Sequence, residues 1–398
     1  MKSLDCYSEI FKDRYPQNLS VEIINAELVH RNMLGVVFLV ILLVIGVFGN
    51  VVVIILYSAK FKRGTNYRFY VLFLAVLDTG NCVLGIPWVI VYLLHPVTFP
   101  SDILCRGGLF VTFTLGMTGS CSLSLIAFDR YRKICCPLKK QLNHKNAKYS
   151  AFAIVAAVLL ASWCVPFLYE NNQLHLSSSN ETGYKCYLAT NSIANRIAKG
   201  YYFILGSAFI MVSIFLTVSY YFIMKKVRFH SKSFQLPKTS HSSCIGRRNS
   251  NIHTRKTTIT FFIITTVFIL TTLPHIITGL VFHFDEDLEC TMNSTAHSLF
   301  NFFYWTVYIN NVANPFIYGL SDERFRGILW RMFTFIFLSP FKTVKKSLPS
   351  AASSSDFVDE KNAVSISVVS ENYASKETIS AVSGNSEKKS TKTDIGQT

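Results

Sequence analysis

Polar side chains stand inside long apolar segments of this chain, where they are costly unless a partner satisfies them. Asp78 follows four apolar residues, and Asn50 lies at the same depth of an earlier apolar segment. Asn310 and Asn314 lie in the last such segment. These side chains can form a hydrogen-bonded polar cluster or hold a cation such as sodium together with water. The sequence leaves both interpretations open.

Two further motifs have the chemistry of conformational switches. Asp129 and Arg130, followed by Tyr131, end the third apolar segment. An arginine beside an aspartate at a helix end can pair locally in one state and be released in another; an interfacial anchor is the simpler interpretation. Pro315, three residues before Tyr318, removes a backbone hydrogen bond, so the helix can kink there and the tyrosine can swing.

Seven apolar stretches must position these residues. Of the 398 residues, 50% are hydrophobic and 16% are charged, a balance typical of a membrane protein rather than of a soluble domain. About 20 apolar residues cross the hydrocarbon core as a helix. We therefore predict an all-α, seven-transmembrane helix bundle with spans at 33–58, 67–94, 104–135, 149–169, 200–224, 257–282 and 298–319.

The charges of the loops orient this bundle. The loops after the first, third and fifth spans are basic, whereas the loop at 285–289 is acidic. Because cytosolic loops carry the excess of basic residues, these three loops face the cytosol and the N-terminus faces outward, as in a plasma-membrane protein. The same topology accounts for the net charge of +16 without nucleic acid as a partner. Glycosylation sequons fall on the outer side, at Asn18, Asn180 and Asn293.

The chain divides into four predicted regions. Residues 1–32 form an extracellular segment, and 33–320 form the bundle. Residues 321–338 have the pattern of an amphipathic helix that lies on membrane lipid at the inner leaflet. Residues 339–398 are rich in serine, threonine and lysine, which predicts a disordered cytoplasmic tail. Phosphorylation of that tail by a receptor kinase would create a charged site for an arrestin-like partner; a solvated linker is the alternative.

Two cysteines are predicted to form a disulfide on the outer side. Cys105 opens the third span and Cys186 lies in the long loop before the fifth, both in an oxidising compartment. Their bond would hold that loop on the top of the third helix. Cys6 and Cys290 are also extracellular, and a second bridge and two free thiols remain equally open, because sequence alone does not fix connectivity.

Over residues 33–333 these motifs resemble those of the rhodopsin-like (class A) G-protein-coupled receptors. The resemblance implies an outer ligand pocket, an outward movement of the inner end of helix six, and a heterotrimeric G protein docked against helix three. It assigns Arg130 as the G-protein-facing switch and Leu138 as a residue that packs into the G protein. It also implies that Tyr220 and Tyr318 stabilise the active state. The matching residues are Gly49, Asn50, residues 74–78, Cys105, Asp129, Arg130, Tyr131, Trp163, Cys186, Tyr220, Pro274, Asn314, Pro315 and residues 316–318.

Three positions depart from the family's pattern. Thr272 stands where the family usually has a tryptophan in helix six, so the activation trigger is expected to differ. Gly119 stands where a serine often helps to bind sodium, which weakens the case for sodium regulation. Thr254 and the two basic residues after it provide no acid at the inner end of helix six. Arg130 therefore lacks a carboxylate partner from that helix, and we expect raised basal activity.

The expected ligand is a peptide, and residues 129–138 resemble neuropeptide receptors of the cholecystokinin and orexin type. Thr112 stands where amine receptors have an aspartate, and the segment 300–318 has no lysine to hold retinal. The N-terminal segment, the long second outer loop and the acidic residues at 285–289 favour a peptide, with a basic one as the best match. By analogy the pocket is lined by residues whose alternative role is helix packing: Thr112, Phe113, Gly116, His275, Gly279, Tyr304 and Tyr308.

Two other functions remain open at this point. Asp78 and Asn314, inside the membrane, would suit an ion-coupled transporter, although no internal repeats are evident. A class A receptor for a lipid or another non-peptide ligand is the second alternative. The chain has neither a His-Glu-x-x-His nor a Gly-x-Ser-x-Gly motif, so we expect no enzymatic activity, no cofactor and no metal centre.

Overall fold

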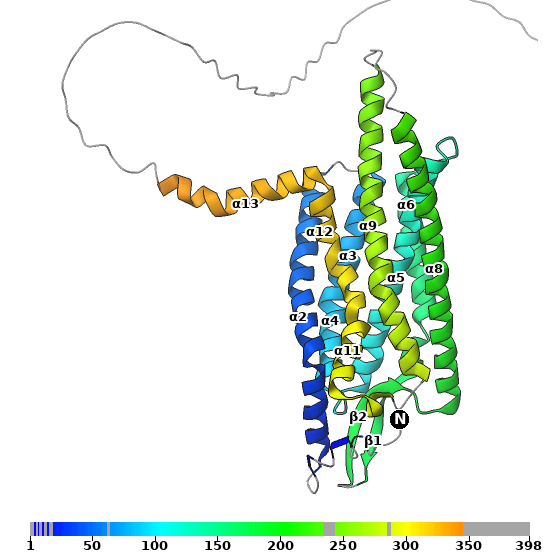
Figure 1. Cartoon of the computed structure of the whole chain (residues 1–398), viewed down its shortest axis with the longest axis vertical. Coiled ribbons are helices and arrows are strands. Elements are labelled where there is room, and N and C mark those ends of the chain that lie inside the picture. The colour runs from blue at the N-terminus through cyan, green and yellow to red at the C-terminus, as the bar shows by residue number, and fades with distance from the viewer. Residues whose placement is uncertain are drawn as a thin grey trace, which may run out of the picture. The chain divides into compact units, whose positions relative to one another are not determined.

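The computed structural model consists mainly of helices that run side by side (Figure 1). Residues 1–342 form one compact unit. The described residues are 4, 7, 10, 11, 14, 15, 19–61, 64–177, 179–233, 243–284 and 288–344, with side chains except at 192, 229–233, 243–254, 283, 284, 289, 290, 333 and 335–344.

Seven helical rods form the bundle within this described part. Six of them are each long and apolar enough to cross a membrane. The seventh is divided by a short 3₁₀ turn into two helices. The rods are α2 (Val21–Lys60); α3 (Asn66–Gly80), continued by the π-helical turn η1 (Asn81–Gly85) and α4 (Ile86–Leu94); α5 (Asp102–Cys135); α6 (His144–Ser162); α8 (Ser192–Ser233); α9 (Ser243–Phe284); and α11 (Ser294–Trp305), η2 (Thr306–Tyr308) and α12 (Ile309–Ser321).

The predicted seven-helix architecture is confirmed, and each predicted span lies within one rod except the fourth. That span, 149–169, runs on from α6 into the short helix α7 (Val165–Leu168) and the first residue of a strand. Another short helix, α10 (Leu288–Thr291), precedes the seventh rod. The predicted amphipathic segment forms α13 (Glu323–Val344), which begins directly after α12.

Local sequence explains where several helices begin and which way their side chains point. Apolar residues face outward as well as inward: Phe48 is 73% exposed and Leu160 is 75% exposed. Such a surface suits lipid, because the backbone polar groups are already paired inside the helices.

Several helices start at a residue whose side chain accepts a hydrogen bond from a backbone N–H of the first turn, namely Ser20, Thr65, Ser101, Asn143 and Asn293.

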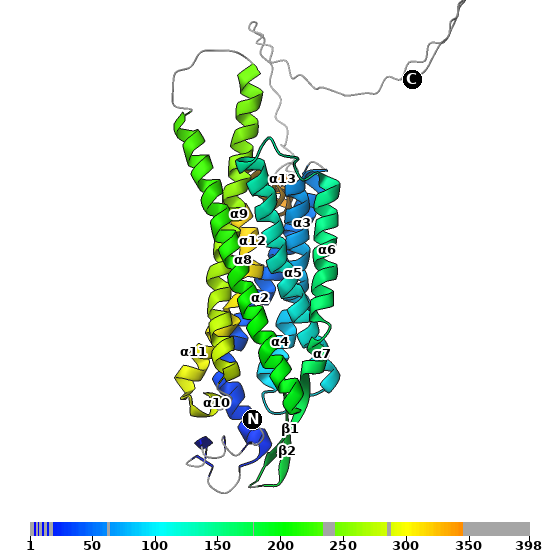
Figure 2. The same cartoon turned by 90° about the vertical axis from the view of Figure 1, so that its right-hand side faces the viewer.

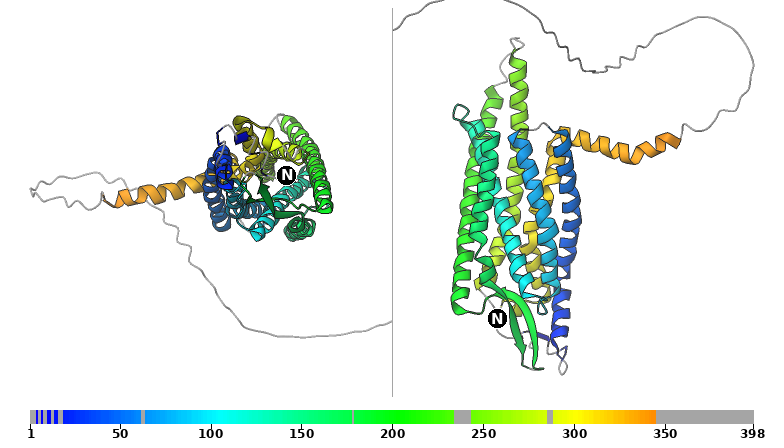
Figure 3. Two further views of the ribbon diagram at one scale, coloured as in Figure 1. Left: turned by 90° about the horizontal axis from the view of Figure 1, so that it is seen from below. Right: turned by 180° about the vertical axis from the view of Figure 1, so that it is seen from behind.

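The loop that was predicted as the long second outer loop contains a β-hairpin, which the sequence did not predict. Its strands β1 (Tyr169–Leu176) and β2 (Glu181–Leu188) pair antiparallel. The hairpin lies at the end of the bundle opposite α13 (Figures 2 and 3). The side chains of Leu4, Tyr7 and Phe11 are buried in a cluster with residues of β1 and α2, and the Leu4 amide donates to the His175 carbonyl at 3.0 Å. The N-terminal segment, α2 and the hairpin therefore share one small core.

The turn η1 controls how α4 packs on α5. After it, Trp88 lies against α5, and its Nε1 donates to the carbonyl oxygen of Leu104 at 2.9 Å. A side chain at position 108 would overlap the ring of Trp88, so only glycine allows this approach. The wide turn thereby places the aromatic side chains of α4 between the helices.

Candidate functional site

The inner end of α5 holds a charged cluster around the fully buried carboxylate of Asp129. Its Oδ2 accepts hydrogen bonds from Arg130 Nη2 at 2.7 Å and from Lys133 Nζ at 3.1 Å. Its Oδ1 accepts one from Asn66 Nδ2 at 3.0 Å. A buried carboxylate is costly unless its lone pairs are used, and here donors from α3 and α5 use them. Arg130 is thus held against its own helix.

Arg130 meets α9 through an aromatic ring rather than through an acid. The guanidinium carbon lies 5.7 Å from the centroid of the Phe261 ring, and both residues are buried. Arg130 Nε has no hydrogen-bond partner among the described residues. The same Phe261 ring meets Tyr67 and Tyr70 of α3 edge-on, with centroids 5.7 and 6.5 Å away. One ring therefore packs α9 against α5 and α3.

The two predicted active-state tyrosines face this region from different helices. The Tyr318 side chain on α12 is fully buried, and within the described part of the chain its hydroxyl has no hydrogen-bond partner. An unpaired buried hydroxyl costs roughly 1–3 kcal/mol. A conformation that supplies a hydrogen-bond partner for the Tyr318 hydroxyl would therefore be stabilised by a similar amount. Tyr220 on α8 packs its ring 5.7 Å from Phe262 of α9. Pro315 lies inside α12, and its ring leaves no room for a side chain at Gly49 of α2.

The loop after α5 presents Leu138 to the surroundings. Leu138 is 100% exposed, whereas Tyr131 is partly buried against the inner core. Gln141 holds the loop in shape, because its Nε2 donates to the carbonyl oxygens of Cys136 at 3.0 Å and Lys139 at 2.8 Å. Gln141 could not be predicted from the sequence, since an amide in a basic loop carries no recognisable signal.

The inner ends of α9 and α12 are tied to α13 and α2 by polar contacts that the sequence did not predict. Lys256 Nζ donates to Glu323 Oε1 at 2.8 Å, and this hydrogen bond lowers the pKa of the Glu323 carboxyl. Asp322 accepts hydrogen bonds from the hydroxyls of Tyr57 at 2.9 Å and Tyr67 at 3.3 Å. In the ion pair between Lys256 and Glu323, the basic residue thus stands on α9 and the acidic residue on α13. The sequence of α9, Ser243–Phe284, contains neither aspartate nor glutamate.

The polar interior joins three helices. Asp78 Oδ2 accepts a hydrogen bond from Asn314 Nδ2 at 2.6 Å, which links α3 to α12. Asn50 Nδ2 donates to the carbonyl oxygen of Asn311 at 2.8 Å, which links α2 to α12. Asn310 instead lines a cavity between the outer halves of the helices. The arrangement fits the hydrogen-bonded cluster directly, and a cation site there stays a prediction.

The cavity has a volume of about 330 Å³, within the range of small-molecule sites. Gly279 is not among its described lining residues; a side chain there would contact the Tyr304 ring. The predicted pocket residues that do line the cavity are Thr112, Phe113, Gly116, His275, Tyr304 and Tyr308. Aromatic lining residues that the sequence analysis did not name include Trp88, Tyr92, Tyr169, Tyr187 and Tyr202.

The chain matches the sequence model of the family described as 7 transmembrane receptor (rhodopsin family) over residues 49–318. The chain belongs to this family. It is 25% identical over 295 residues to trace amine-associated receptor 365 of Petromyzon marinus, covering 72% of this chain and 75% of the relative. It is 26% identical over 296 residues to somatostatin receptor type 1 of Rattus norvegicus, covering 72% of this chain and 68% of the relative. It is 24% identical over 309 residues to type-1 angiotensin II receptor of Homo sapiens, covering 74% and 79%.

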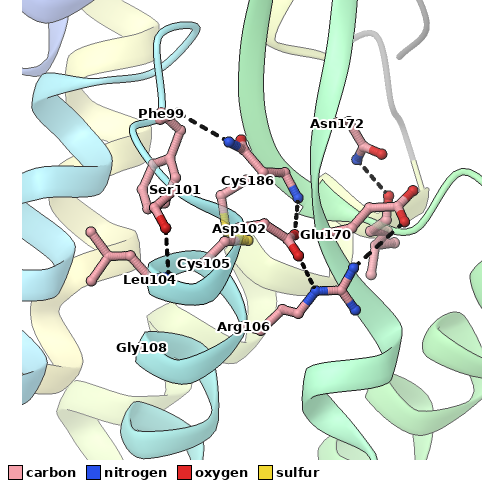
Figure 4. Close-up of a disulfide and its surroundings, with 12 residues drawn as sticks. Phe99, Ser101, Asp102, Leu104, Cys105, Arg106, Gly108, Glu170, Asn172 and Cys186 are labelled. Atoms are coloured by element: carbon pink, nitrogen blue, oxygen red, sulfur yellow. Dashed lines mark hydrogen bonds and ion pairs between the residues drawn. A yellow bond between two sulfur atoms is a disulfide. The ribbon is translucent and has the colours of Figure 1, made fainter.

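As a class A receptor, this membrane protein signals from an extracellular ligand to a G protein and belongs to a receptor class rather than to an enzyme family. The predicted disulfide is present at the end of the bundle that carries the hairpin. Cys105 of α5 and Cys186 of β2 are bonded, with Cα atoms 5.5 Å apart (Figure 4). Beside it, Asp102 accepts hydrogen bonds from Arg106 Nε at 2.7 Å and from the Asn171 amide at 2.9 Å. The start of α5 is therefore fixed to both strands of the hairpin.

Two of the receptor's three sequons can be placed. Asn180 is exposed at the turn of the hairpin, with a φ of 54° that asparagine tolerates better than most residues. Asn293 is exposed and caps α11 by accepting a hydrogen bond from the Ala296 amide at 2.8 Å. Other predicted features lie outside the described residues or side chains: Cys6, Asn18, residues 285–287, the side chains of Glu289 and Cys290, and the tail from 345 onward.

Proposed function

We propose that this receptor binds a peptide at its outer face and activates a heterotrimeric G protein at its inner face. The observation that carries the proposal is an aromatic cavity whose walls include the hairpin. Tyr169 of β1 and Tyr187 of β2 line the cavity together with residues deep in the bundle. A peptide that inserts one end between the helices would therefore also run along the strands, where its backbone can find hydrogen-bonding partners.

At the inner face, Arg130 is the proposed switch. When the inner end of α9 moves outward, the Phe261 ring leaves the guanidinium, which is then free to turn from Asp129 toward the G protein. Tyr318 gains hydrogen-bond partners in that state, and Leu138 inserts into the G protein. The basic loops face the cytosol and the N-terminus faces outward, with sugars on Asn18, Asn180 and Asn293. A receptor kinase and an arrestin act on the tail.

A neuropeptide library applied to cells that express the full chain tests this proposal, with calcium and cyclic AMP as readouts. We expect a peptide-dependent signal that is lost in Arg130→Ala at equal surface expression. His275→Ala and Tyr304→Ala should each lower the potency of that peptide. If both left potency unchanged, the peptide would bind elsewhere.

A non-peptide ligand is the second candidate, and the mainly apolar and aromatic lining of the cavity favours it. The same cells can be exposed to a tissue lipid extract before and after protease digestion. A signal that survives digestion and depends on Tyr304 would replace the peptide with a lipid-like ligand.

A further inference from the structure

One carboxylate at the inner end of α5 is paired with two cations. Asp129 Oδ2 accepts hydrogen bonds from Arg130 Nη2 at 2.7 Å and from Lys133 Nζ at 3.1 Å. Lys133 stands about one helical turn after Asp129, so the two side chains share one face of the helix. One buried negative charge is therefore shared by two positive charges.

The two cations differ in their exposure to water. The side chain of Arg130 is 4% exposed, whereas that of Lys133 is 29% exposed. A lysine also has a flexible four-carbon stem and a compact ammonium group with three donors. Lys133 therefore loses less contact with water than Arg130 does when both bind the same oxygen.

The other oxygen of Asp129 is held from α3. Asn66 Nδ2 donates to Asp129 Oδ1 at 3.0 Å and to the carbonyl oxygen of Leu142 at 2.9 Å. Neither of these contacts involves Arg130. If Arg130 turned away, Asp129 would therefore keep one cation and one amide donor.

The second cation changes what the departure of Arg130 costs. A buried carboxylate without a cation is strongly unfavourable, and it takes up a proton instead of staying charged. Lys133 removes that requirement, because it stays on the carboxylate. Lys133 also repels the guanidinium of Arg130, since like charges that share one oxygen atom lie close together. Both effects of Lys133 favour the release of Arg130.

The remaining groups around this cluster do not replace Lys133. The ring of Phe261 faces Arg130 from α9, which contains neither aspartate nor glutamate. On α6, His144 interacts electrostatically with Lys148 and Arg68. The other titratable side chains that interact with Asp129 or Arg130 are tyrosines, which are neutral near pH 7, namely Tyr67 and Tyr70 of α3 and Tyr220 of α8.

We propose that Lys133 is a second counter-ion that holds Asp129 when Arg130 turns away, so that the receptor switches without protonation of Asp129. This proposal rests on the proposed role of Arg130 as the switch. Lys133 is a positioning residue, because it acts through Asp129 and Arg130. The proposal adds that switching is insensitive to the pH at the inner face near neutrality.

A double-mutant cycle tests this pairing without a ligand or a G protein. Arg130→Ala reproduces the departure of Arg130, and Lys133→Met removes the second cation but keeps an apolar stem. Purified full-length receptor in lipid nanodiscs is melted at about pH 7.5 and about pH 6.0, where an unperturbed aspartate is ionised. Each single variant leaves one cation on Asp129, so its change in melting temperature relative to wild type should be the same at both pH values.

The combined variant should behave differently. At the higher pH, its melting temperature should lie at least about 5 °C below the value obtained by adding the two single effects, because Asp129 then has no cation. At the lower pH, this deficit should shrink to about half or less. The folded variant takes up a proton that the unfolded chain does not, and such a protein becomes less stable as the pH rises.

Three further variants identify the groups involved. Asp129→Asn, added to the combined variant, removes the carboxylate and should abolish the pH dependence. Lys133→Arg in place of Lys133→Met keeps a cation and should restore additivity. Lys145→Met is the matched control, because Lys145 is an exposed lysine in the first turn of α6. Combined with Arg130→Ala, it should give additive effects at both pH values.

Nucleotide exchange on a heterotrimeric G protein provides a second readout. The ligand-independent rate of wild type, after subtraction of the receptor-free rate, should change by less than about twofold between the two pH values. The rate of Lys133→Met should fall at least about tenfold below wild type at the higher pH. It should recover by up to about tenfold per pH unit on acidification, as one proton is taken up with each switching event. Lys133→Arg should follow wild type.

Additive effects of Arg130→Ala and Lys133→Met, or a deficit that is equal at both pH values, would overturn the proposal. If the combined variant did not fold, the exchange rate of Lys133→Met would decide, and a pH profile parallel to that of wild type would overturn it. A melting cycle with the expected result in a receptor that never stimulates nucleotide exchange would refute the G-protein coupling and leave the second counter-ion standing.

Discussion

Replacing Phe261 by leucine should raise ligand-independent signalling. The substitution keeps an apolar side chain but removes the ring that Arg130 faces at 5.7 Å. A cation–π contact between desolvated groups contributes about 2 kcal/mol. The lost edge-on contacts with Tyr67 and Tyr70 act in the same direction, because both tyrosines stand on α3 and α9 leaves them when it moves.

The expected size of the effect follows from a two-state equilibrium. A free-energy change of about 2 kcal/mol alters the equilibrium constant roughly 30-fold. A resting receptor with about 1% of its molecules in the open state would then have about 20% open. The basal rate of nucleotide exchange should rise in the same proportion.

Purified receptor in nanodiscs, with a heterotrimeric G protein and no ligand, provides the assay. Phe262→Leu is the matched control, because Phe262 is the next residue along α9 and its ring contacts Tyr220 of α8 instead of Arg130. Arg130→Ala sets the floor of the signal. An unchanged or lowered basal rate in folded Phe261→Leu would refute the argument that this ring restrains α9.

Three other predictions concern the fold and the inner ion pair. Replacing both Cys105 and Cys186 by serine should cost about 4.5 kcal/mol from the loop constraint, since the bond joins positions 81 residues apart; thermal melting checks this, with Cys164→Ser, a free cysteine, as the control. Asn32→Ala leaves the Leu93 carbonyl and the Asn301 amide without their partner and should destabilise the receptor by roughly 1–3 kcal/mol, visible as a lower melting temperature. Lys256→Met and Glu323→Gln should each raise basal exchange by less than Phe261→Leu, because both side chains are exposed. Because the pKa of Glu323 is lowered, its carboxylate stays ionised and paired with Lys256 at every pH above the ordinary pKa of a carboxyl group. The pair is lost only as the pH falls through the lowered pKa. The difference between wild type and Lys256→Met should therefore stay constant from about pH 8 to about pH 6.

Features set by the bilayer were predictable from the sequence. Each crossing has to satisfy its own backbone within a helix, so the apolar stretches revealed the spans without any tertiary information. Loop charges placed Cys105 and Cys186 on the same side, and their bond followed from that topology. Of the seven pocket residues predicted by helix-by-helix analogy, six line the cavity.

Features set by tertiary contact were not predictable. The hairpin has only a weak alternating pattern in Tyr169–Leu176, and its stability comes from the disulfide and from the N-terminal residues packed against it. Lys256 and Glu323 are far apart in sequence and meet only because α13 begins directly after α12. The role of Phe261 depends on which face of α9 turns inward, and an apolar helix carries little information about that.

The wide turn η1 has a consequence for comparing this receptor with its relatives. A π-helical turn contains one residue more than an α-helical turn for about the same rotation of the chain. Deleting a single residue between Asn81 and Gly85 would therefore return the turn to an α-helix and leave Trp88 and Tyr92 facing the cavity. Residues after this five-residue segment are accordingly offset by one position from those of a relative that has a regular α-helix there. An alignment that puts a one-residue gap on the wrong side of it would assign lipid-facing residues to the binding pocket.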